Sequence, residues 1–595
     1  MGREVGKQLK EFRVMIWTIG LSFLGSVAMI SLYQSYLATS WVVQGLVWLV
    51  MFGMCYSFSR HLRSGRKGIL RWFRDRINVL FVFGYSFLLW LSMRGTMEHL
   101  HDNAWYVTAF VYVGSYLSLC LTVWYVGYLL TKHSYPSITR RSSYRWIWWY
   151  ALPMILSWGL YLLAFYPGIM GSDSHSHWEQ AHTHEYSNWH PVLYTWFIEW
   201  LLKLFHSPAT VAFAQIILLA TIVGYGLYSF RKVGMEKRLL WFVSLFLALL
   251  PINGLYSILL LKDVLYSGSI LFVTIVLFNI VATRGKWLTS VGHQFIFGLS
   301  MFGMVAFRHN GVYIVYVVLF LLCVCYYKYM IRILLPMAVV LFLFYYISGP
   351  VYEEIGVSEK NPNEKLGIPQ QQIANVLVQN GKITDEQKAY IHDIMPIEKW
   401  KEYYNPTYTD PIKFAKSYNS DVIFEEGDPS TFYKTWLSIV AENPYLATEA
   451  FLKQTSLVWQ MHQRYTDRHE YYNFRTTIQQ PNDHGLQTEP KLNGLNGFLT
   501  KVAAFTEHHM WPVVWRPAVY AAILLLSLFI AIRKNGWKAG LVGLPVLLNI
   551  GTILAGIPAQ HFRYLYANVL IFLFLILLAL WKQENKPIQK KELEL

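Results

Sequence analysis

Residues 264–283 have the sequence VLYSGSILFVTIVLFNIVAT, a stretch of twenty residues without a charged side chain. A helix needs about 20 apolar residues to cross a hydrocarbon core about 30 Å thick. Similar stretches recur along the chain, and hydropathy delimits about fourteen of them: near 14–36, 41–58, 77–94, 105–131, 146–166, 208–229, 239–257, 264–283, 292–307, 311–327, 333–348, 513–532, 539–557 and 564–581. The sequence therefore predicts an all-α polytopic membrane protein with about fourteen transmembrane helices.

The amino-acid composition agrees with this class. Of the 595 residues, 54% are hydrophobic and 14% are charged, whereas roughly a quarter are charged in an ordinary soluble domain. This composition excludes an ordinary soluble enzyme, a disordered chain, a collagen and a coiled coil. The cysteines lie in apolar stretches, and their spacing offers neither a disulfide framework nor a zinc pattern: Cys55, Cys120, Cys323 and Cys325.

The net charge of +16 comes from 51 Lys and Arg against 35 Asp and Glu. In a soluble protein such an excess would suggest nucleic acid as a partner. Here the basic residues gather in alternate connecting segments, as the positive-inside rule requires when the N-terminus is cytoplasmic. These segments contain Arg3, Arg60, Arg140, Arg231, Arg284 and Arg533. We therefore attribute the charge to membrane topology, expect both termini in the cytoplasm, and expect no nucleic-acid partner.

Two segments are longer than the other connections, and both fall on the outer face in this topology: 167–207 and 349–512. The second is long enough for a domain of its own. Helical stretches divided by turn-forming NP, DP and GDP sequences predict that it is mainly helical. Function is expected at these two segments.

The segment 167–207 carries a dense polar cluster directly after a span. Pro167 and Gly168 end that span, because proline lacks an amide hydrogen and glycine ends helices readily. The polar residues that follow are Asp173, His175, His177, Glu179, His182, His184, Glu185 and His190. Residues 194–205, YTWFIEWLLKLF, then place apolar side chains at helical spacing, so we expect a helix that lies along the membrane interface.

The histidines leave two interpretations open. Imidazole and carboxylate groups suit zinc and similar divalent ions, and the candidate ligands are His175 and His177. Their spacing of two residues, however, projects the rings apart on a strand or a helix, and no HExxH spacing is present. Surface histidines without a metal are the alternative. A divalent metal therefore stays an open expectation, and no cofactor is assigned.

Four short motifs carry a resemblance to known families. The first is an Asp in a long outer loop, followed by HPVLY at 190–194 and an interfacial helix; it resembles the GT-C superfamily of membrane glycosyltransferases. The others are LLKDVLYS at 260–267, FRHNGVYI at 307–314 and QHFRYLY at 560–566; they resemble a bacterial family of large multi-span proteins related to that superfamily. The resemblance covers roughly 146–581. The chain departs from the superfamily in one respect, because four spans precede the Asp-bearing loop, which usually follows the first span.

The resemblance implies four parts of the chain. We expect an N-terminal four-helix membrane bundle with basic cytoplasmic loops, a GT-C-like membrane module with an outer catalytic loop, an extracytoplasmic domain, and three C-terminal transmembrane helices with a cytoplasmic tail. Their residues are 1–145, 146–348 with its loop 167–207, 349–512 and 513–595, respectively.

The resemblance also implies the chemistry. In the superfamily the sugar donor is carried on a polyprenyl phosphate or diphosphate, and an acidic residue at the start of the first outer loop acts as general base or positions the acceptor. That residue matches Asp173, with Glu179 and His190 expected to assist. Cations must neutralise the leaving phosphate. The expected substrate-binding residues are Lys262, Asp263, Arg308, Asn310, Arg563 and Tyr564.

Each role has an ordinary alternative. Asp173 suits a helix N-cap or a solvated loop, and Lys262 with Asp263 suits a structural ion pair at a membrane edge. Arg308 suits an arginine that extends its charge to the membrane surface. Arg563 stands on the outer side, where the positive-inside rule disfavours a basic residue.

The sequence thus predicts an inverting glycosyltransferase embedded in a bacterial cytoplasmic membrane. Its expected partners are a polyprenyl-phosphate-linked sugar donor, a glycan or lipid acceptor on the extracytoplasmic side, and membrane lipids. Two alternatives stay open: a transporter or flippase of lipid-linked saccharides, and a polymerase or ligase of cell-surface polysaccharides.

Overall fold

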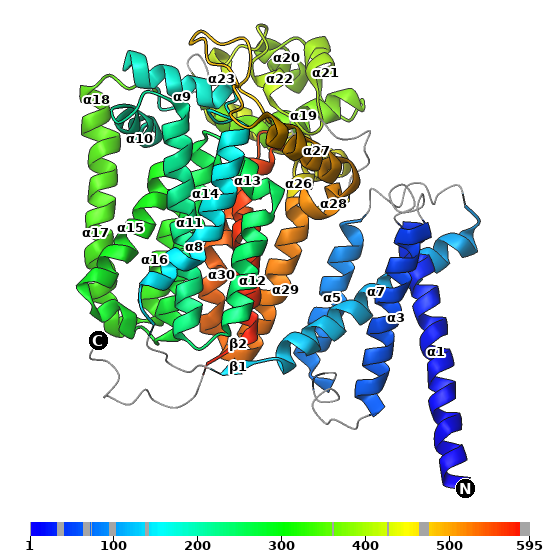
Figure 1. Cartoon of the computed structure of the whole chain (residues 1–595). Coiled ribbons are helices and arrows are strands. Elements are labelled where there is room, and N and C mark those ends of the chain that lie inside the picture. Colours follow the sequence, from blue (N-terminus) through cyan, green and yellow to red (C-terminus); the bar gives the residue numbers. More distant parts are fainter. Residues whose placement is uncertain are drawn as a thin grey trace. The chain divides into compact units, whose positions relative to one another are not determined.

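The computed structural model describes residues 2–32, 41–63, 72, 74–93, 103–136, 142–359, 362–424, 428–462 and 475–583. These residues are almost entirely helical (Figure 1), which confirms the all-α class. Their one sheet is the parallel pair β1 (Tyr135–Pro136) and β2 (Trp581–Lys582). The basic loop after residue 63 lies largely outside the described residues, and the tail after residue 583 lies wholly outside them.

The chain divides into two compact units. The smaller unit consists of Met1–Ser134, Trp459–Arg468 and His509–Ala522. Asp75 starts one of its helices by accepting hydrogen bonds from the backbone N–H groups of Ile77 and Asn78, which helix N-termini leave without partners. The helices of this unit are α1 (Gly2–Leu32), α3 (Trp41–Arg63), α5 (Arg76–Leu91), α7 (Trp105–Lys132) and α28 (Trp511–Val514).

The larger unit consists of Tyr135–Val458, His469–His508 and Ile523–Leu595. Its apolar helices are α8 (Arg145–Ala164), α11 (Pro208–Lys232), α12 (Lys237–Leu249), α13 (Pro251–Ser257), α14 (Lys262–Ala282), α15 (Val291–Phe307), α16 (Gly311–Cys325), α17 (Met330–Tyr346), α29 (Pro517–Asn535, which begins in the smaller unit), α30 (Gly540–Gly556) and α31 (Tyr566–Leu580). Short 3-10 or π turns join them: η2 (Lys286–Thr289), η3 (Tyr327–Tyr329), η4 (Ile347–Val351), η8 (Trp537–Ala539) and η9 (Phe562–Leu565).

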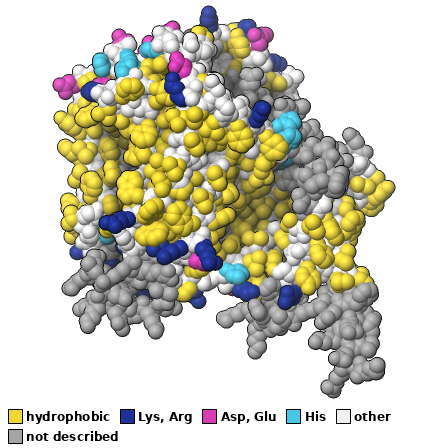
Figure 2. Space-filling model, viewed as in Figure 1, with side chains coloured by type: hydrophobic (Ala, Val, Ile, Leu, Met, Phe, Trp, Pro, Cys, Tyr) yellow, Lys and Arg dark blue, Asp and Glu magenta, His cyan; other side chains and the backbone are white. Residues whose placement is uncertain are grey.

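Among the described residues, eight helical segments are long and apolar enough to cross a membrane: Trp105–Lys132, Arg145–Ala164, Pro208–Lys232, Lys262–Ala282, Tyr327–Glu354, Pro517–Asn535, Trp537–Gly556 and Phe562–Leu580. A ninth forms if α12 and α13, bent by 64° at their junction, make one broken span. Figure 2 shows the matching surface, with hydrophobic side chains across the middle of the larger unit and charged ones toward its two ends. These features are those of a membrane-embedded protein.

The expected count of fourteen spans is not confirmed. The helices α15 and α16 have 17 and 15 residues, so at 1.5 Å per residue they reach about 26 and 22 Å. That is less than the hydrocarbon core. The helix α5 has 16 residues, the apolar part of α1 covers Met15–Ser31, and α3 is not among the candidate spans. The cytoplasmic placement of the termini stays a prediction.

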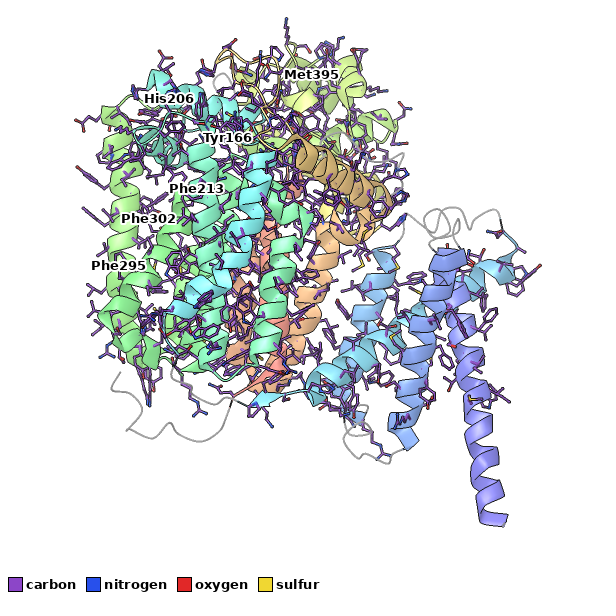
Figure 3. The ribbon with its side chains drawn as sticks, viewed as in Figure 1. Tyr166, His206, Phe213, Phe295, Phe302 and Met395 are labelled. Atoms are coloured by element: carbon purple, nitrogen blue, oxygen red, sulfur yellow. The ribbon has the colours of Figure 1, made fainter. Side chains whose placement is uncertain are left out.

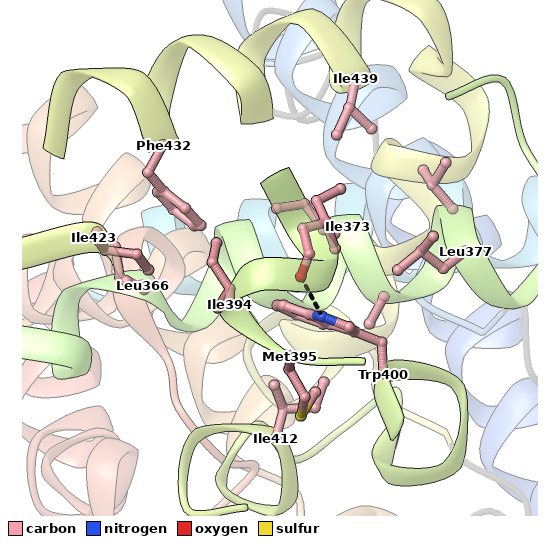
Figure 4. Close-up of a cluster of buried hydrophobic side chains, with 13 residues drawn as sticks. Leu366, Ile373, Leu377, Ile394, Met395, Trp400, Ile412, Ile423, Phe432 and Ile439 are labelled. Carbon is pink, nitrogen blue, oxygen red and sulfur yellow. Dashed lines mark hydrogen bonds between the residues drawn. The ribbon is translucent and has the colours of Figure 1, made fainter. Parts of the chain in front are cut away.

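The segment after α17 is helical, as its turn pattern predicts, and has its own hydrophobic core. Trp400 is fully buried in this core, and its indole N–H donates to the carbonyl oxygen of Ile391 at 3.3 Å (Figure 4). The elements are α18 (Tyr352–Glu354), η5 (Pro362–Leu366), α19 (Gly367–Val378), α20 (Asp385–Ile394), α21 (Ile397–Tyr403), α22 (Asp410–Lys413), α23 (Asp421–Phe424), α24 (Pro429–Glu442), α25 (Pro444–Gln454), α26 (Ser456–Trp459) and α27 (Asn493–His509).

Two further helices, α9 (Ser172–Thr183) and α10 (Val192–Leu202), fill the connection after α8. In Figure 3, Tyr166 and His206 from this part of the chain lie toward the same end of the larger unit as Met395 of the segment 362–458. Phe213, Phe295 and Phe302 lie along the helices below them. Polar connections from several spans therefore meet at one end of the larger unit.

Candidate functional site

Backbone bridges fix where α9 begins. Ile169 bridges Leu259, and Met170 bridges Ile478, both in parallel register. Gly168 allows the backbone to come close enough for the bridge between Ile169 and Leu259. Its φ is +132°, and a Cβ there would lie 3.2 Å from the carbonyl oxygen of Ile258. A side chain at this position would therefore be both strained and crowded. The start of α9 is thus held against the chain that leads into α14.

Asp173 lies in the first turn of α9 but does not cap the helix. The cap residue is Gly171, whose backbone N–H donates to the hydroxyl of Ser174 at 3.1 Å. The side chain of Asp173 is 18% exposed and turns toward other charged groups. The alternative of an N-cap aspartate is therefore wrong for this residue.

The bent pair α12–α13 delivers Lys262 and Asp263. Pro251 starts α13, so the chain turns by 64°, and residues 258–261 run beside Ile169 before α14 begins at Lys262. Both side chains are buried, at 8% and 2% exposure, and their Nζ and Oδ2 atoms are 3.8 Å apart. Lys262 and Asp263 therefore form the ion pair that the sequence suggested, and each of them also contacts other charged side chains.

Three side chains meet at one carboxylate oxygen, Oδ2 of Asp173. Nη1 of Arg563 lies 2.6 Å from it, Nζ of Lys262 lies 3.4 Å away, and Nε2 of His190 also lies 3.4 Å away. Each of these contacts ends on Oδ2. Among the described residues, the other oxygen, Oδ1, has no hydrogen bond or ion pair. The carboxylate is therefore held from one side and open on the other.

Asp263 extends the group toward Arg308. Nη1 of Arg308 lies 3.0 Å from Oδ1 of Asp263, and its guanidinium lies over the ring of Tyr564, 4.6 Å from the centroid. Arg563 also donates from Nη2 to the hydroxyl of Tyr564 at 3.4 Å. We call Asp173, His190, Lys262, Asp263, Arg308 and Arg563 the Asp173 cluster. Tyr564 lies between its two arginines.

The Asp173 cluster has an excess of positive charge. Lys262, Arg308 and Arg563 supply three positive charges, and Asp173 and Asp263 supply two negative ones, so one positive charge remains uncompensated. Ion pairs in such a poorly hydrated place are much stronger than at the surface. An anion that enters the cluster would therefore be bound by groups already in position.

Asp173 and His190, two members of the Asp173 cluster, lie outside the candidate spans. Their pKa values are strongly shifted. Burial alone would raise the pKa of Asp173, but the charges of Arg563 and Lys262 outweigh it and hold the pKa well below its usual value. Burial and the charge of Lys262 lower the pKa of His190 to about 3, despite the nearby Asp173. At neutral pH, Asp173 is therefore a carboxylate and His190 is a neutral imidazole.

Buried polar groups surround the cluster. His177 contacts the ring of His190, with centroids 5.2 Å apart, and its Nδ1 lies 2.8 Å from the hydroxyl of Thr195 on α10. Several buried polar atoms in and beside the cluster have no hydrogen-bond partner among the described residues, and buried polar groups are seldom left in this state. Among them are Nε of Arg563, Nε2 of His177 and the hydroxyl of Tyr266.

Five predicted site residues are not members of the Asp173 cluster: His177 and Tyr564, which contact it, and Glu179, Asn310 and His175. Glu179 is exposed on α9, six residues after Asp173. Asn310 donates from Nδ2 to the hydroxyl of Thr552 at 2.8 Å. His175 contacts the carbonyl oxygen of Gln479 through Nε2 at 3.1 Å, away from the partner of His177. In the part of the chain that the structure describes, no group of three or more His, Cys, Asp and Glu side chains is placed to hold a metal.

The sequence contains no pattern that predicts several residues near the cluster. Arg475 lies beside the start of α9, where a Cβ on Gly171 would be 3.5 Å from its Nε. Thr195 and Tyr266 sit on apolar helices and differ in no visible way from packing residues. Their proximity follows from the crossing of connections far apart in sequence, which spacing does not show.

A family model described as a family of unknown function, DUF6020, matches residues 25–594. The chain belongs to the DUF6020 family. No curated protein and no solved structure matches it. The match begins within α1, so the N-terminal helices of this DUF6020 protein belong to the family sequence together with the unit that carries the Asp173 cluster.

Proposed function

We propose that this DUF6020 protein is an integral membrane glycosyltransferase of the GT-C type. It transfers a sugar from a polyprenyl-phosphate carrier to a glycan, lipid or polymer acceptor on the extracytoplasmic side of a bacterial cytoplasmic membrane. The observation that carries the proposal is the geometry of Asp173. One oxygen is held by Arg563, Lys262 and His190, the other is open, and the surrounding cations exceed the carboxylates.

The open oxygen suits the acceptor. A hydroxyl group that attacks the anomeric carbon must lose its proton, and a carboxylate within hydrogen-bond reach can accept it. Oδ1 of Asp173 takes this proton while the new carbon–oxygen bond forms. The anomeric carbon–oxygen bond to the phosphate breaks in the same displacement, so the configuration inverts. His190, neutral at neutral pH, helps to hold the carboxylate in position without consuming the proton.

The cations suit the leaving group. The departing polyprenyl phosphate gains negative charge, and fixed cations in a poorly hydrated site stabilise that charge. Arginine is well shaped for this because its guanidinium binds phosphate oxygens in pairs. In the cluster, Nε of Arg563 has no hydrogen-bond partner among the described residues. That N–H group is available to a phosphate oxygen.

Donor binding also prepares the base. In the free protein, Arg563 and Lys262 lower the pKa of Asp173, which makes its carboxylate a weak proton acceptor. A phosphate that attracts these two cations takes part of their charge from Asp173. The pKa of Asp173 then rises toward its ordinary value, and the carboxylate becomes a stronger base when the donor is bound.

The position in the fold suits a lipid-linked substrate. Lys262 begins α14 and Arg563 lies in η9, so both stand at the ends of candidate spans. Beside them, α10 is short and apolar, and the chain after it exposes Leu204 and Phe205 at 79% and 64%. These side chains offer apolar contact to a polyprenyl chain whose phosphate lies in the cluster.

A transporter of lipid-linked saccharides is the second candidate. The feature that favours it is the broken helix α12–α13, which ends five residues before Lys262. Discontinuous helices commonly form substrate sites in transporters. A polymerase or ligase that uses the same carrier would share the proposed chemistry with a different acceptor.

Sugar release tests the proposal. The purified full-length protein in lipid is given a panel of radiolabelled polyprenyl-phosphate sugars, with and without a chelator. Asp173→Asn is compared with Glu185→Gln, an exposed carboxylate after the same helix. We expect turnover of one donor by the wild type and by Glu185→Gln, and its loss in Asp173→Asn. Movement of intact labelled lipid across the bilayer, without sugar release, would favour the transporter instead.

A further inference from the structure

A second polar site lies at the other end of the larger unit. The helix α14 carries Lys262 of the Asp173 cluster at its first residue and ends at Ala282. Its 21 residues span about 30 Å at 1.5 Å per residue, which is the thickness of the hydrocarbon core. Next to its last turn lies a cavity of about 550 Å³. The cavity therefore stands at the membrane edge opposite the cluster.

The described lining of the cavity is basic. Arg284, Lys328 and Lys538 contribute to its wall, and none of the lining residues that the structure describes is Asp or Glu. Lys538 is fixed in place, since its Nζ donates to the carbonyl oxygen of Cys325 at 2.9 Å and lies 4.9 Å from the centre of the Tyr326 ring. Lys328 is exposed. The positive charges of Lys328 and Lys538 in the wall favour an anionic occupant.

The floor of the cavity is already assembled. The side chain of Asn535 donates to the carbonyl oxygen of Trp581 at 3.1 Å and accepts from the backbone N–H of Gln583 at 2.8 Å. Gln583 in turn donates to the carbonyl oxygen of Val281 at 3.1 Å. These bonds tie the ends of α29, β2 and α14 together. The cavity is therefore formed before a ligand binds, and ligand binding does not have to order its walls.

The surroundings favour a lipid over a soluble anion. Tyr327 and Trp537 line the cavity and are 66% and 63% exposed, as expected of aromatic side chains at the level of lipid headgroups. From the same wall, α17 exposes Ile331 at 78% and, one turn later, Leu335 at 61%. Apolar side chains at this spacing can accompany an acyl chain away from the headgroup. Figure 2 shows Lys and Arg side chains along this lower edge of the hydrophobic surface.

We propose that this cavity binds the phosphate headgroup of an anionic membrane lipid. Basic pockets between membrane helices commonly recognise such headgroups. The bound lipid would join the ends of α14, α17 and α29 at this edge. Its binding does not depend on the sugar transfer proposed for the Asp173 cluster, because the two sites share no side chain.

Lipid retention by the purified full-length protein tests the site. The protein is titrated with phosphatidylglycerol and, separately, with phosphatidylcholine of the same acyl chains, and bound lipid is counted by native mass spectrometry. The double variant Arg284→Gln/Lys328→Gln removes two cavity cations. The control pair Arg238→Gln/Lys286→Gln removes one Arg and one Lys that do not line the cavity.

We expect preferential retention of phosphatidylglycerol by the wild type and by the control pair. The cavity variant should bind it roughly tenfold to thirtyfold more weakly, since each cation near a membrane surface contributes about a factor of five. An equal loss in both pairs, or no loss in either, would overturn the proposal. Stabilisation by inorganic phosphate alone, without preference between the two lipids, would overturn the assignment to a lipid.

Discussion

Arg563 and Asp173 are 390 residues apart in the chain, yet Nη1 of the arginine lies 2.6 Å from Oδ2 of the aspartate. The contact joins the start of the last span to the first turn of α9. Both side chains are 18% exposed, so neither the charges nor their pairing is fully hydrated. Removing one partner of such a buried pair is costly, because the other charge is left unpaired. A second anion that replaces Asp173 as the partner of Arg563 avoids this cost, so the pair is suited to an exchange of anions.

Arg563→Gln is expected to weaken donor binding. The substitution removes the guanidinium that holds Asp173 and that we assign to the leaving phosphate. Truncating one partner of a buried charged pair costs several kcal/mol, so the KM for the donor should rise by at least about tenfold. Steady-state kinetics measure this change, with Arg145→Gln, an exposed arginine at the start of α8, as the control. An unchanged KM with a normal kcat would remove Arg563 from the site.

The stability of the protein should fall as the pH drops below about 6.5, the ordinary pKa of histidine. The pKa of His190 is lowered to about 3, so between these values the unfolded chain binds a proton that the folded protein does not. The depressed pKa of Asp173 acts with the same sign below its ordinary value of about 3.9, where its stabilisation is lost as the pH falls. Both pKa shifts therefore lower the free energy of unfolding at acidic pH.

His190→Gln should therefore flatten this dependence on pH. Thermal unfolding between pH 7.5 and 4.5 measures the slope, and His392→Gln, an exposed histidine on α20, serves as the control. His177, whose pKa burial lowers in the same direction, should preserve part of the slope. The interpretation fails if the wild type and His190→Gln lose stability in parallel over this range.

Gln454 is expected to position Arg563 without touching the Asp173 cluster. Its side chain is fully buried, and its Nε2 donates to the carbonyl oxygen of Ile557 at 2.7 Å and to the hydroxyl of Thr409 at 3.0 Å. Gln454→Ala releases the segment that leads into η9, and small displacements of reacting groups are costly. Turnover should fall about tenfold.

The exposed Gln379 offers a matched control, and Gln379→Ala should keep normal turnover. The pH profile and the KM for the donor separate positioning from folding. A positioning role predicts that added donor restores part of the lost rate in Gln454→Ala. Equal losses of rate and of folded protein would instead make Gln454 a purely structural residue.

Trp400→Ala should destabilise the segment 362–458. The indole is fully buried in the core of 362–458, and replacing a buried Trp with Ala costs about 3–5 kcal/mol. Hydrogen exchange of this segment should quicken, and limited proteolysis should cut it first. Tyr445→Ala removes an aromatic ring that is 72% exposed and should change neither. Unaltered protection in Trp400→Ala would contradict an independent core in this segment.

The sequence predicted the helical class and many of the membrane helices because apolar stretches report directly on burial and length. The count of fourteen spans is not confirmed, because α15 and α16 look long in hydropathy but have only 17 and 15 residues as helices. Their ends lie at Arg308 and at Tyr326, where turns and tertiary contacts begin. Hydropathy averages over such turns and so does not detect them.

The resemblance to the GT-C superfamily pointed to Asp173 and His190, and charges at span ends pointed to Lys262, Asp263, Arg308 and Arg563. The structure brings these six together. Glu179 was grouped with them only because it is near in sequence, and the helical turn of α9 leaves it exposed. Arg475 could not be predicted, because its place depends on the bridge between Met170 and Ile478. The chemical roles of all these residues stay predictions.

The most direct test of sugar transfer at Asp173 measures two quantities on one variant. For Asp173→Asn, sugar release from the best donor and binding of the sugar-free polyprenyl phosphate are both determined in lipid. We expect release to fall by about two to four orders of magnitude, while the phosphate binds at least as tightly, because the competing carboxylate charge is gone. Unchanged release, or equal loss of release and binding, would contradict a role for Asp173 as the base.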